Sequence, residues 1–259
     1  MPFIERPAGR LFYQFDGPVD RPVVMLSNSL GTDHGLWDPQ VPELAKRYRV
    51  LRYDNRGHGR SDEPSGSLTI ADLGGDVVTI LDALGLERVT FMGLSIGGMI
   101  GMWLGANAAT RIERLVLCNT SAYLGNPDLW NQRIAAVRQG GLKSILPGVI
   151  ERWFTPGFRA SNPQAIEKTS RMMLATKPSG YIALCEAIRD MDQRASIGAI
   201  RAPTLVICGS QDVATTPAHG KAIVDAVAGA RLVTLEAAHI SNVEQATRFT
   251  AAVTEFLSR

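Results

Sequence analysis

Short apolar runs alternate with helical patterns along most of this chain. The runs expected to form strands are Leu11–Phe15, Val23–Leu26, Val50–Tyr53, Val89–Met92, Leu115–Cys118, Thr204–Cys208 and Arg231–Leu235. Most of them are nearly continuous in apolar residues, which is typical of parallel strands that are buried on both faces. The alternation therefore predicts an α/β fold, in which a mostly parallel sheet is flanked by helices on both faces.

Helical patterns fill the gaps between these runs. We expect helices over Ile70–Leu84, Ile96–Asn107 and Pro217–Val227. Near the C-terminus, Ser241 and Glu244 have the spacing of a capping box, in which two side chains exchange hydrogen bonds with the backbone of a helix's first turn. This spacing predicts a final helix that runs from Ser241 to Leu257.

The alternation breaks between residues 121 and 198, where no convincing strand pattern occurs. Helix-like stretches cover 129–139, 143–152, 164–175 and 180–190, and glycine- or proline-containing breakers separate them. We interpret this segment as a helical insertion between two strands of the sheet, forming a cap over the active site. The expected division is a core formed by 1–120 and 199–259, with a cap inserted at 121–198.

Composition narrows the classes of function. Of the 259 residues, 45% are hydrophobic and 20% are charged, and 27 basic against 25 acidic residues leave a net charge of +2. This balance, without a basic stripe, argues against nucleic acid or an anionic membrane as a partner. No apolar run is long enough to span a membrane, and no secretory signal pattern occurs. Three widely spaced cysteines favour a reducing compartment, so we expect a cytoplasmic protein, of undetermined oligomeric state.

The clearest chemical signal is the segment Gly93-Leu94-Ser95-Ile96-Gly97, which follows an apolar run and precedes a helical pattern. It matches the G-x-S-x-G nucleophile elbow in the strand–turn–helix context that the motif requires. The glycines leave room where strand and helix approach closely, and the strained turn points the serine hydroxyl outward at the positive end of the helix dipole. An incidental serine in a glycine-rich turn is the alternative interpretation.

A serine nucleophile needs a histidine base and an acid that orients it, and after this elbow they follow in the order acid, then histidine. Asp212 lies just past an apolar run, and His239 lies between the last predicted strand and the final helix. Catalytic groups of open α/β sheets gather at such strand ends. We therefore predict a triad of Ser95, Asp212 and His239, although Asp212 could also be an ordinary turn residue. Asn119 stands at the other position where an acid could follow a strand.

Two backbone amides are expected to bind the oxyanion of the reaction. One belongs to Ile96, which follows the nucleophile, and the other to Leu30, in the loop after an early strand. Many hydrolases with this elbow carry His-Gly-x-Pro in that loop, whereas this chain has Asn-Ser-Leu-Gly; the amide stays usable because it is backbone chemistry. No HExxH or paired carboxylate–histidine spacing suggests a metal, so we expect neither a metal nor a cofactor.

Taken together, these segments resemble the α/β-hydrolase fold family from end to end. The resemblance rests on SNSLGTDHGLWDPQ, RYDNRGHGRSD, GLSIGGM, APTLVICGSQDVATTP and AAHISNVEQ. Within this fold the chain resembles the 3-oxoadipate enol-lactonases. That resemblance implies a carboxylic ester hydrolase that opens a five-membered enol-lactone to 3-oxoadipate, in the bacterial degradation of aromatic compounds by the β-ketoadipate pathway. The segment around Asp54, Arg56 and His58 resembles the family's glycine-rich turn, and we interpret these residues as structural.

The implied substrate is a small lactone with a free carboxylate, so a cationic group is expected in the pocket. Arg133 and Arg138 of the insertion are candidates, because arginine binds carboxylates through two hydrogen bonds, although either could be a solvated surface residue. Trp130 and Trp153 could wall the pocket or simply pack the cap on the core. His34 could line the pocket from its loop near the strand ends.

Other functions stay open on the sequence. The same triad would serve another carboxylesterase or lactonase, a cofactor-free perhydrolase, or a hydrolase of carbon–carbon bonds. A ligand receptor that kept the fold would need no catalysis. Ser95 argues against dehalogenases and epoxide hydrolases, which commonly use an aspartate nucleophile, and an intact triad in the expected order argues against a receptor.

Overall fold

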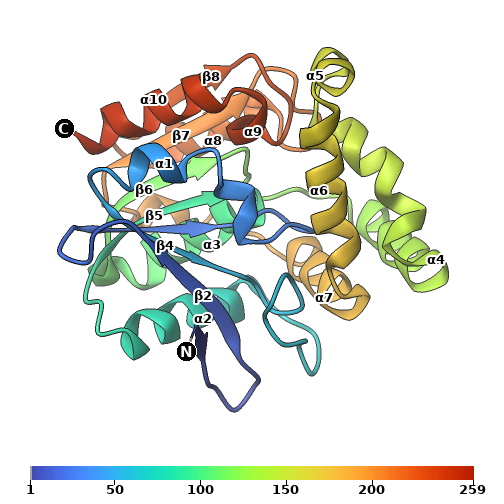
Figure 1. The fold of residues 1–259 in the computed structure, drawn as a ribbon, viewed down its shortest axis with the longest axis horizontal. Coiled ribbons are helices and arrows are strands. Elements are labelled where there is room, and N and C mark those ends of the chain that lie inside the picture. The colour runs from blue at the N-terminus through green and yellow to red at the C-terminus, as the bar shows by residue number, and fades with distance from the viewer. Residues whose placement is uncertain (1) are drawn as a thin grey trace.

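One sheet of eight strands forms the centre of the computed structural model, which describes residues 2–259 (Figure 1). The strands are β1 (Phe3–Ile4), β2 (Leu11–Asp16), β3 (Val23–Ser27), β4 (Arg49–Tyr53), β5 (Val89–Leu94), β6 (Ile112–Cys118), β7 (Thr204–Gly209) and β8 (Arg231–Leu235). Their spatial order is β1-β2-β4-β3-β5-β6-β7-β8. β2 is antiparallel to both of its neighbours, and the strands from β4 to β8 in this order pair in parallel.

The predicted mostly parallel sheet is confirmed, and its apolar runs form the central strands. Every residue of β5 and of β7 is buried, as expected for strands covered on both faces. The pattern missed only β1, whose two residues are too few to show a period. Because the central strands are parallel, their carboxyl ends meet at one edge of the sheet, and the loops after β3, β5 and β7 lie together there.

Helices cover both faces of the sheet. Those of the core are α1 (Val41–Leu44), α2 (Ile70–Ala83), α3 (Ile96–Asn107), α8 (Pro217–Ala226), α9 (Ser241–Glu244) and α10 (Ala246–Leu257), with 3₁₀ turns η1 (His34–Trp37), η2 (Ala109–Arg111) and η3 (Ile197–Ala199). α2 packs on α3 and α3 packs on β5 and β6, behind the sheet in Figure 1, whereas α1 and α10 lie in front. Thr69 and Asp72 form the capping box that starts α2.

Four helices follow β6, and together we call them the helical insertion: α4 (Pro127–Trp153), α5 (Pro156–Ser161), α6 (Pro163–Ala175) and α7 (Pro178–Arg189). They lie on the right of Figure 1, next to the strand ends. Each begins with proline, which suits a first helical turn and explains the breakers seen in the sequence. The two stretches predicted at 129–139 and 143–152 join in α4, which is interrupted at Gly141 by a non-helical φ of +64°.

The capping box predicted at Ser241 is wrong. The backbone breaks at Gln245 between α9 and α10, and neither helix has a side-chain cap. The Ser241 hydroxyl instead donates to Asn119 Oδ1 at 2.5 Å. The Glu244 carboxylate accepts the Ala238 N–H at 2.9 Å and also contacts the hydroxyl of Thr155. Tertiary hydrogen bonds have therefore replaced the local capping that the spacing predicted.

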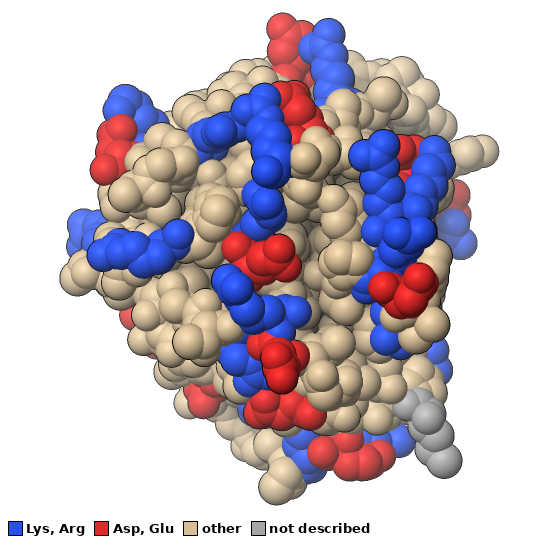
Figure 2. All heavy atoms as spheres, turned by 90° about the vertical axis from the view of Figure 1, so that its left-hand side faces the viewer, with Lys and Arg blue, Asp and Glu red and all other residues tan. Residues whose placement is uncertain are grey.

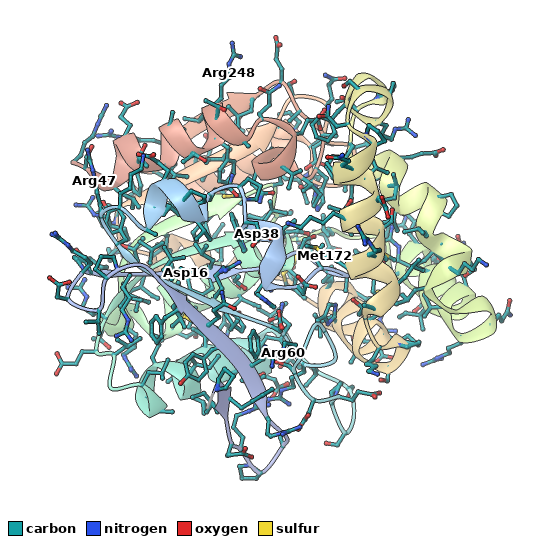
Figure 3. All side chains as sticks on the ribbon, in the orientation of Figure 1. Asp16, Asp38, Arg47, Arg60, Met172 and Arg248 are labelled. Carbon is teal, nitrogen blue, oxygen red and sulfur yellow. The ribbon has the colours of Figure 1, made fainter. Side chains whose placement is uncertain are left out.

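Polar contacts and close packing fasten the helical insertion to the core. Asp38, labelled in Figure 3, accepts a hydrogen bond from Arg52 of β4 at 2.7 Å and pairs with Lys168 of α6. Gly57 packs directly on Gly180 of α7, where a Cβ on Gly57 would lie 2.3 Å from the Gly180 Cα. These contacts hold α6 and α7 next to the loops at the carboxyl end of the sheet.

The face turned away from the helical insertion is mixed in charge. Figure 2 shows basic side chains lying beside acidic ones there, in keeping with the near-balance of 27 basic and 25 acidic residues. Arg47 and Arg248, labelled in Figure 3, lie toward this side of the molecule. Within residues 2–259, no helix combines the length and apolar character needed to cross a lipid bilayer.

Candidate active site

Ser95 stands at the junction of β5 and α3, with φ +60° and ψ −117°. Side chains rarely tolerate this conformation, so the surrounding structure must enforce it. The Ser95 carbonyl accepts a hydrogen bond from Thr120 Oγ1 at 2.7 Å. A Cβ on Gly93 would lie 2.1 Å from the Gly97 carbonyl oxygen, and one on Gly97 would lie 2.3 Å from that of Ser27. The turn therefore has the strained geometry and the two required glycines of a nucleophile elbow.

Asp212, in the loop after β7, is buried and fully hydrogen-bonded. Its Oδ2 lies 2.8 Å from His239 Nδ1 and accepts hydrogen bonds from Thr215 Oγ1 at 2.7 Å and Asn119 Nδ2 at 3.0 Å. Its Oδ1 accepts the backbone N–H groups of Ala214 and Thr215 at 2.8 and 2.9 Å. Both carboxylate oxygens are thereby satisfied within the protein, and the carboxyl plane is fixed toward the histidine.

These contacts decide the charge of the pair. Burial is the largest single influence on the pKa of Asp212 and by itself raises it. The charge of His239, together with hydrogen bonds from His239 and Thr215, outweighs burial and holds the pKa of Asp212 well below its usual range. An ionised carboxylate only accepts hydrogen bonds, so His239 Nδ1 carries the hydrogen of this contact. In the neutral imidazole Nε2 is then the nitrogen that can accept a proton.

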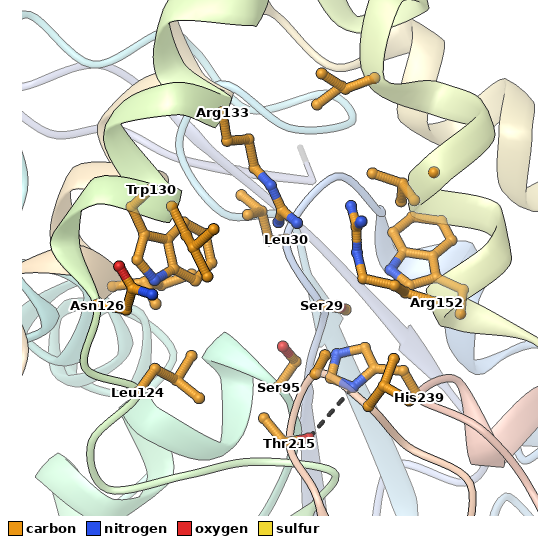
Figure 4. A pocket seen from close by; sticks show the side chains of 18 of the residues that line it. Ser29, Leu30, Ser95, Leu124, Asn126, Trp130, Arg133, Arg152, Thr215 and His239 are labelled. Carbon is orange, nitrogen blue, oxygen red and sulfur yellow. Dashed lines mark hydrogen bonds between the residues drawn. The ribbon is translucent and has the colours of Figure 1, made fainter.

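Ser95 and His239 line the same cavity. In Figure 4 the imidazole ring lies beside the Ser95 hydroxyl, and its second nitrogen is on the side of that hydroxyl. The Ser95 side chain comes from the elbow, and the His239 side chain comes from the loop between β8 and α9. The structure thus brings together Ser95, Asp212 and His239 from three strand-end loops, as the sequence predicted.

Two backbone amides near Ser95 have no hydrogen-bond acceptor among residues 2–259. They belong to Leu30, in the loop after β3, and to Ile96, the first residue of α3. Both residues are buried, and Leu30 lines the cavity. Buried N–H groups are normally paired, so two unpaired ones beside a strained serine are suited to binding a developing negative charge. These are the amides that the sequence suggested for the oxyanion.

A cavity of about 530 Å³ lies between the strand ends and the helical insertion. Ser29, Leu30, Ser95 and His239 line it from the core, and residues of α4 and α7 line it from the insertion. Most of the lining from the insertion is apolar, including Trp130 and Trp153. This volume and lining are suited to a small organic molecule with an apolar body.

Two arginines of α4 point into this cavity. Figure 4 shows the guanidinium groups of Arg133 and Arg152 on the side of the cavity opposite Ser95 and His239. Both side chains are half-buried, and neither forms an ion pair with a carboxylate of residues 2–259. Burial, followed by the charge of Arg133, lowers the pKa of Arg152. Two close, partly desolvated cations without a counter-charge favour an anionic ligand between them.

The other predicted substrate residues divide into two groups. Trp130 and Trp153 line the cavity, and Arg133 stacks over the Trp130 ring at 5.0 Å. Arg138 is exposed and pairs with Glu186 at 3.4 Å, outside the cavity lining. His34 is also absent from the lining, because its Nδ1 is turned to the Asp54 carboxylate at 3.0 Å. Arg138 is therefore placed as a surface arginine and His34 as a structural histidine, which were the alternative interpretations of these two residues.

Sequence reasoning missed Arg152, Thr215 and Asn119. Arg152 is separated from Arg133 by the kink at Gly141, so helical periodicity could not place the two side chains together. Its one available signal was its position next to Trp153. Thr215 and Asn119 act on the triad through hydrogen bonds to Asp212, and no short motif in the sequence marks that role. Among residues 2–259 no cluster of three or more histidine, cysteine or acidic side chains is suited to hold a metal ion.

Comparisons with known proteins agree with this geometry. The family model for the alpha/beta hydrolase fold matches residues 22–246. The 3-oxoadipate enol-lactonase 2 of Acinetobacter baylyi is 40% identical over 249 residues, which cover 96% of this chain and 93% of that protein. The crystal structure of the enol-lactonase from Burkholderia xenovorans LB400 superposes with a TM-score of 0.98 at 43% identity, covering 100% of both chains. A hydrolase from Pseudomonas aeruginosa PA01 superposes at 0.96 with 45% identity, covering 99% and 98%.

Proposed function

The chain belongs to the α/β-hydrolase fold family, and from that premise we propose that it is a 3-oxoadipate enol-lactonase that works through Ser95, His239 and Asp212. The observation that carries the proposal is one cavity that holds both groups such a reaction needs. Ser95 and His239 lie on its core side, and Arg133 and Arg152, which have no carboxylate partner within residues 2–259, lie on the insertion side. A lactone with a free carboxylate is complementary to both sides.

Acylation begins at the lactone carbonyl. His239 Nε2 takes the hydroxyl proton of Ser95 as Oγ attacks the carbonyl carbon, and Asp212 stabilises the imidazolium that forms. The N–H groups of Leu30 and Ile96 bind the oxyanion of the tetrahedral intermediate. When the intermediate collapses, the bond between the carbonyl carbon and the ring oxygen breaks, and the imidazolium returns its proton to that oxygen. The product is an acyl-enzyme whose chain carries an enol next to the terminal carboxymethyl group, and the enol converts to the ketone.

Deacylation repeats the same steps with water. His239 takes a proton from a water molecule, the resulting hydroxide attacks the ester carbonyl, and Ser95 leaves with the proton from the imidazolium. The products are 3-oxoadipate and the free serine. No step in this sequence transfers an electron, and each proton taken by His239 is returned within the same half-reaction.

The two arginines explain how this lactone would be selected. The substrate carboxylate is attached through one methylene to the carbon that carries the ring oxygen, so it stays on the product after the ring opens. Arg133 and Arg152 can bind this carboxylate with charge-assisted hydrogen bonds, each worth about 1.5–3 kcal/mol. The apolar lining around Trp130 and Trp153 then packs on the ring. A neutral ester would lose the first of these interactions and keep the second.

The direct test is turnover by the purified protein. We expect fast loss of 3-oxoadipate enol-lactone, slow hydrolysis of a simple aryl acetate, and a loss of about 10⁴-fold or more in both when Ser95 is replaced by alanine. Brisk ester hydrolysis without lactone turnover would keep the triad and reject the substrate, leaving another carboxylesterase or a perhydrolase. A Ser95→Ala protein with full lactone activity would reject the mechanism.

A further inference from the structure

His58 is a fully buried histidine that the mechanism above does not use. It lies in the glycine-rich turn after β4, within hydrogen-bond distance of two backbone groups. Its Nε2 accepts the N–H of Gly31 at 3.0 Å, and its Nδ1 lies 3.0 Å from the carbonyl oxygen of Arg56. A carbonyl only accepts, so Nδ1 carries the ring hydrogen and Nε2 is the acceptor. The neutral ring therefore joins two backbone segments that are far apart in the sequence.

The Gly31 N–H, which His58 accepts, lies in the same loop as the Leu30 amide that is expected to bind the oxyanion. Thr32 donates to the Ser29 carbonyl through its N–H at 3.1 Å and its hydroxyl at 2.8 Å, so residues 29–32 form a β-turn. Gly31, at the third position, has φ +78°, which is the value for a type II turn. Types I and II differ by a flip of the central peptide, which here joins Leu30 to Gly31. The N–H of Gly31 belongs to that peptide.

We propose that His58 is a positioning residue for the oxyanion hole, and that it holds the 29–32 turn in the type II form by accepting the Gly31 N–H. This inference rests on the proposed function, because it takes the Leu30 amide as an oxyanion donor. In the type I form the central peptide would reverse, and the Gly31 N–H would lose its buried acceptor. His58 thereby fixes the backbone on one side of Leu30, and the two hydrogen bonds that Thr32 donates to the Ser29 carbonyl fix it on the other.

The surroundings make this contact rigid. A Cβ on Gly31 would lie 3.0 Å from Met173 Sδ and 3.2 Å from Tyr181 Cε2, so the turn is packed between His58 and the helical insertion. The segment that carries His58 is also fixed, because the N–H of Lys177 in the insertion donates to the carbonyl of Gly57 at 2.9 Å. The turn cannot follow a moved histidine without disturbing these contacts.

The proposal predicts an effect on one kinetic constant. The negative charge on the carbonyl oxygen develops only as the tetrahedral intermediate forms, so a displaced Leu30 amide lowers kcat and leaves substrate binding largely unchanged. Removing an oxyanion donor outright costs about 10²–10³-fold in kcat. Loosening one donor should cost less, about 10–100-fold. A role in folding alone would instead reduce the amount of competent protein.

Two conservative variants separate these roles. In His58→Gln the amide oxygen can occupy the position of Nε2 and accept the Gly31 N–H. In His58→Asn the shorter amide can reach the Arg56 carbonyl but not Gly31. His219, a partly buried histidine of α8 that contacts Thr216, offers the control His219→Ala. Each protein is assayed with 3-oxoadipate enol-lactone and with an aryl acetate, and kcat is expressed per site titrated with a fluorophosphonate.

We expect kcat of His58→Asn to fall about 10–100-fold on both substrates with KM changed less than about 3-fold, and His58→Gln to recover most of it. Equal kcat per titrated site in the Asn and Gln variants, or a difference confined to KM or to the titrated fraction, would overturn the inference. The aryl acetate allows the role of His58 to be tested independently of the proposed lactone substrate. A wild-type protein that hydrolyses the acetate and not the lactone rejects the substrate, and the comparison of the two His58 variants still decides the role of His58.

Discussion

The strand-end loops and the helical insertion place charge in the cavity in opposite ways. In the loops, the Asp212 carboxylate receives five hydrogen bonds from within the protein and pairs with His239. In the insertion, Arg133 and Arg152 face the cavity without a carboxylate partner among residues 2–259. Because all hydrogen bonds of the Asp212 carboxylate come from within the protein, this group is oriented before the substrate binds. The two arginines lack a carboxylate partner among these residues, so an anionic ligand can supply their counter-charge. We infer that the loops supply the chemistry and that the insertion supplies selectivity for a carboxylate.

The largest effect is expected when the charge of the Asp212 carboxylate, in the strand-end loops, is removed. Asp212→Asn keeps the shape of the acid but allows His239 to adopt the wrong tautomer, and we expect kcat to fall about 10⁴-fold on both the lactone and an aryl acetate. Steady-state kinetics on both substrates checks this. Because the arginines are intact, product affinity measured by calorimetry should change little. A variant that loses only the lactone activity would contradict the division of roles.

Acidification should affect the loop side through His58. Burial, as the largest influence, lowers its pKa from 6.5 to about 4, against smaller opposing effects of the Arg56 carbonyl and Asp54. The unfolded chain binds this proton near pH 6.5 and the folded protein only near pH 4, so stability is lost as the pH falls through this window. The shift corresponds to roughly 3 kcal/mol.

Denaturant unfolding of wild-type and His58→Gln proteins at pH 7 and pH 4.5 measures this contribution. We expect the wild type to lose more stability on acidification than the variant, because glutamine does not titrate. His219→Ala serves as the control and should lose as much as the wild type. Identical losses in the wild type and His58→Gln would show that His58 is not kept neutral by folding.

On the insertion side, Arg152→Gln should affect only substrates that carry a carboxylate. Losing one charge-assisted hydrogen bond to the ligand costs about 1.5–3 kcal/mol, so we expect KM for the enol-lactone to rise about 10–100-fold. KM and kcat for an aryl acetate should stay within about 2-fold. Arg138→Gln is the matched control on the same helix, because Arg138 lies outside the cavity lining and pairs with Glu186. An equal effect of the two substitutions would remove Arg152 from the site.

The smallest expected effect concerns Thr215, whose hydroxyl donates to Asp212 at 2.7 Å. Thr215→Val removes one of the five hydrogen bonds, worth about 1 kcal/mol, and should lower kcat about 5-fold on both substrates. Thr216→Val is the control, because the Thr216 hydroxyl contacts His219 instead of the acid. If the Thr215 variant proved as weak as Asp212→Asn, the carboxylate would depend on this one hydroxyl more than its contacts indicate.

The parts of the molecule that the sequence predicted are those defined by short local patterns. The apolar runs located seven of the eight strands. The five residues around Ser95 identified the elbow because a Cβ on Gly93 or Gly97 would lie only 2.1–2.3 Å from a backbone oxygen, so the turn requires both glycines. Asp212 and His239 followed from their positions after strands, since parallel strands end at one edge of the sheet. The proposed boundaries of the cap at 121 and 198 remain a prediction.

The parts that it did not predict depend on tertiary contacts. The kink at Gly141 turns the two halves of α4 so that Arg133 and Arg152 face one cavity, whereas Arg138 faces solvent. The helical periodicity of the sequence gives no information about the direction of this kink. Serine is a favoured helix-capping residue, but the Ser241 hydroxyl donates its hydrogen bond to Asn119 Oδ1, and Asn119 Nδ2 in turn donates to Asp212. A local motif thus failed where its side chain was used by the network around the acid.

The most direct test of the division between loops and insertion is a selectivity ratio. It is kcat/KM for 3-oxoadipate enol-lactone divided by kcat/KM for its neutral methyl ester, measured in the wild type and in the Arg133→Gln/Arg152→Gln double variant. We predict that the double substitution lowers the ratio by about 100-fold or more and leaves kcat/KM for the methyl ester within about 3-fold. If the two substrates instead lost activity equally, the arginines would support the fold or the chemistry, which would contradict their role in recognising a carboxylate.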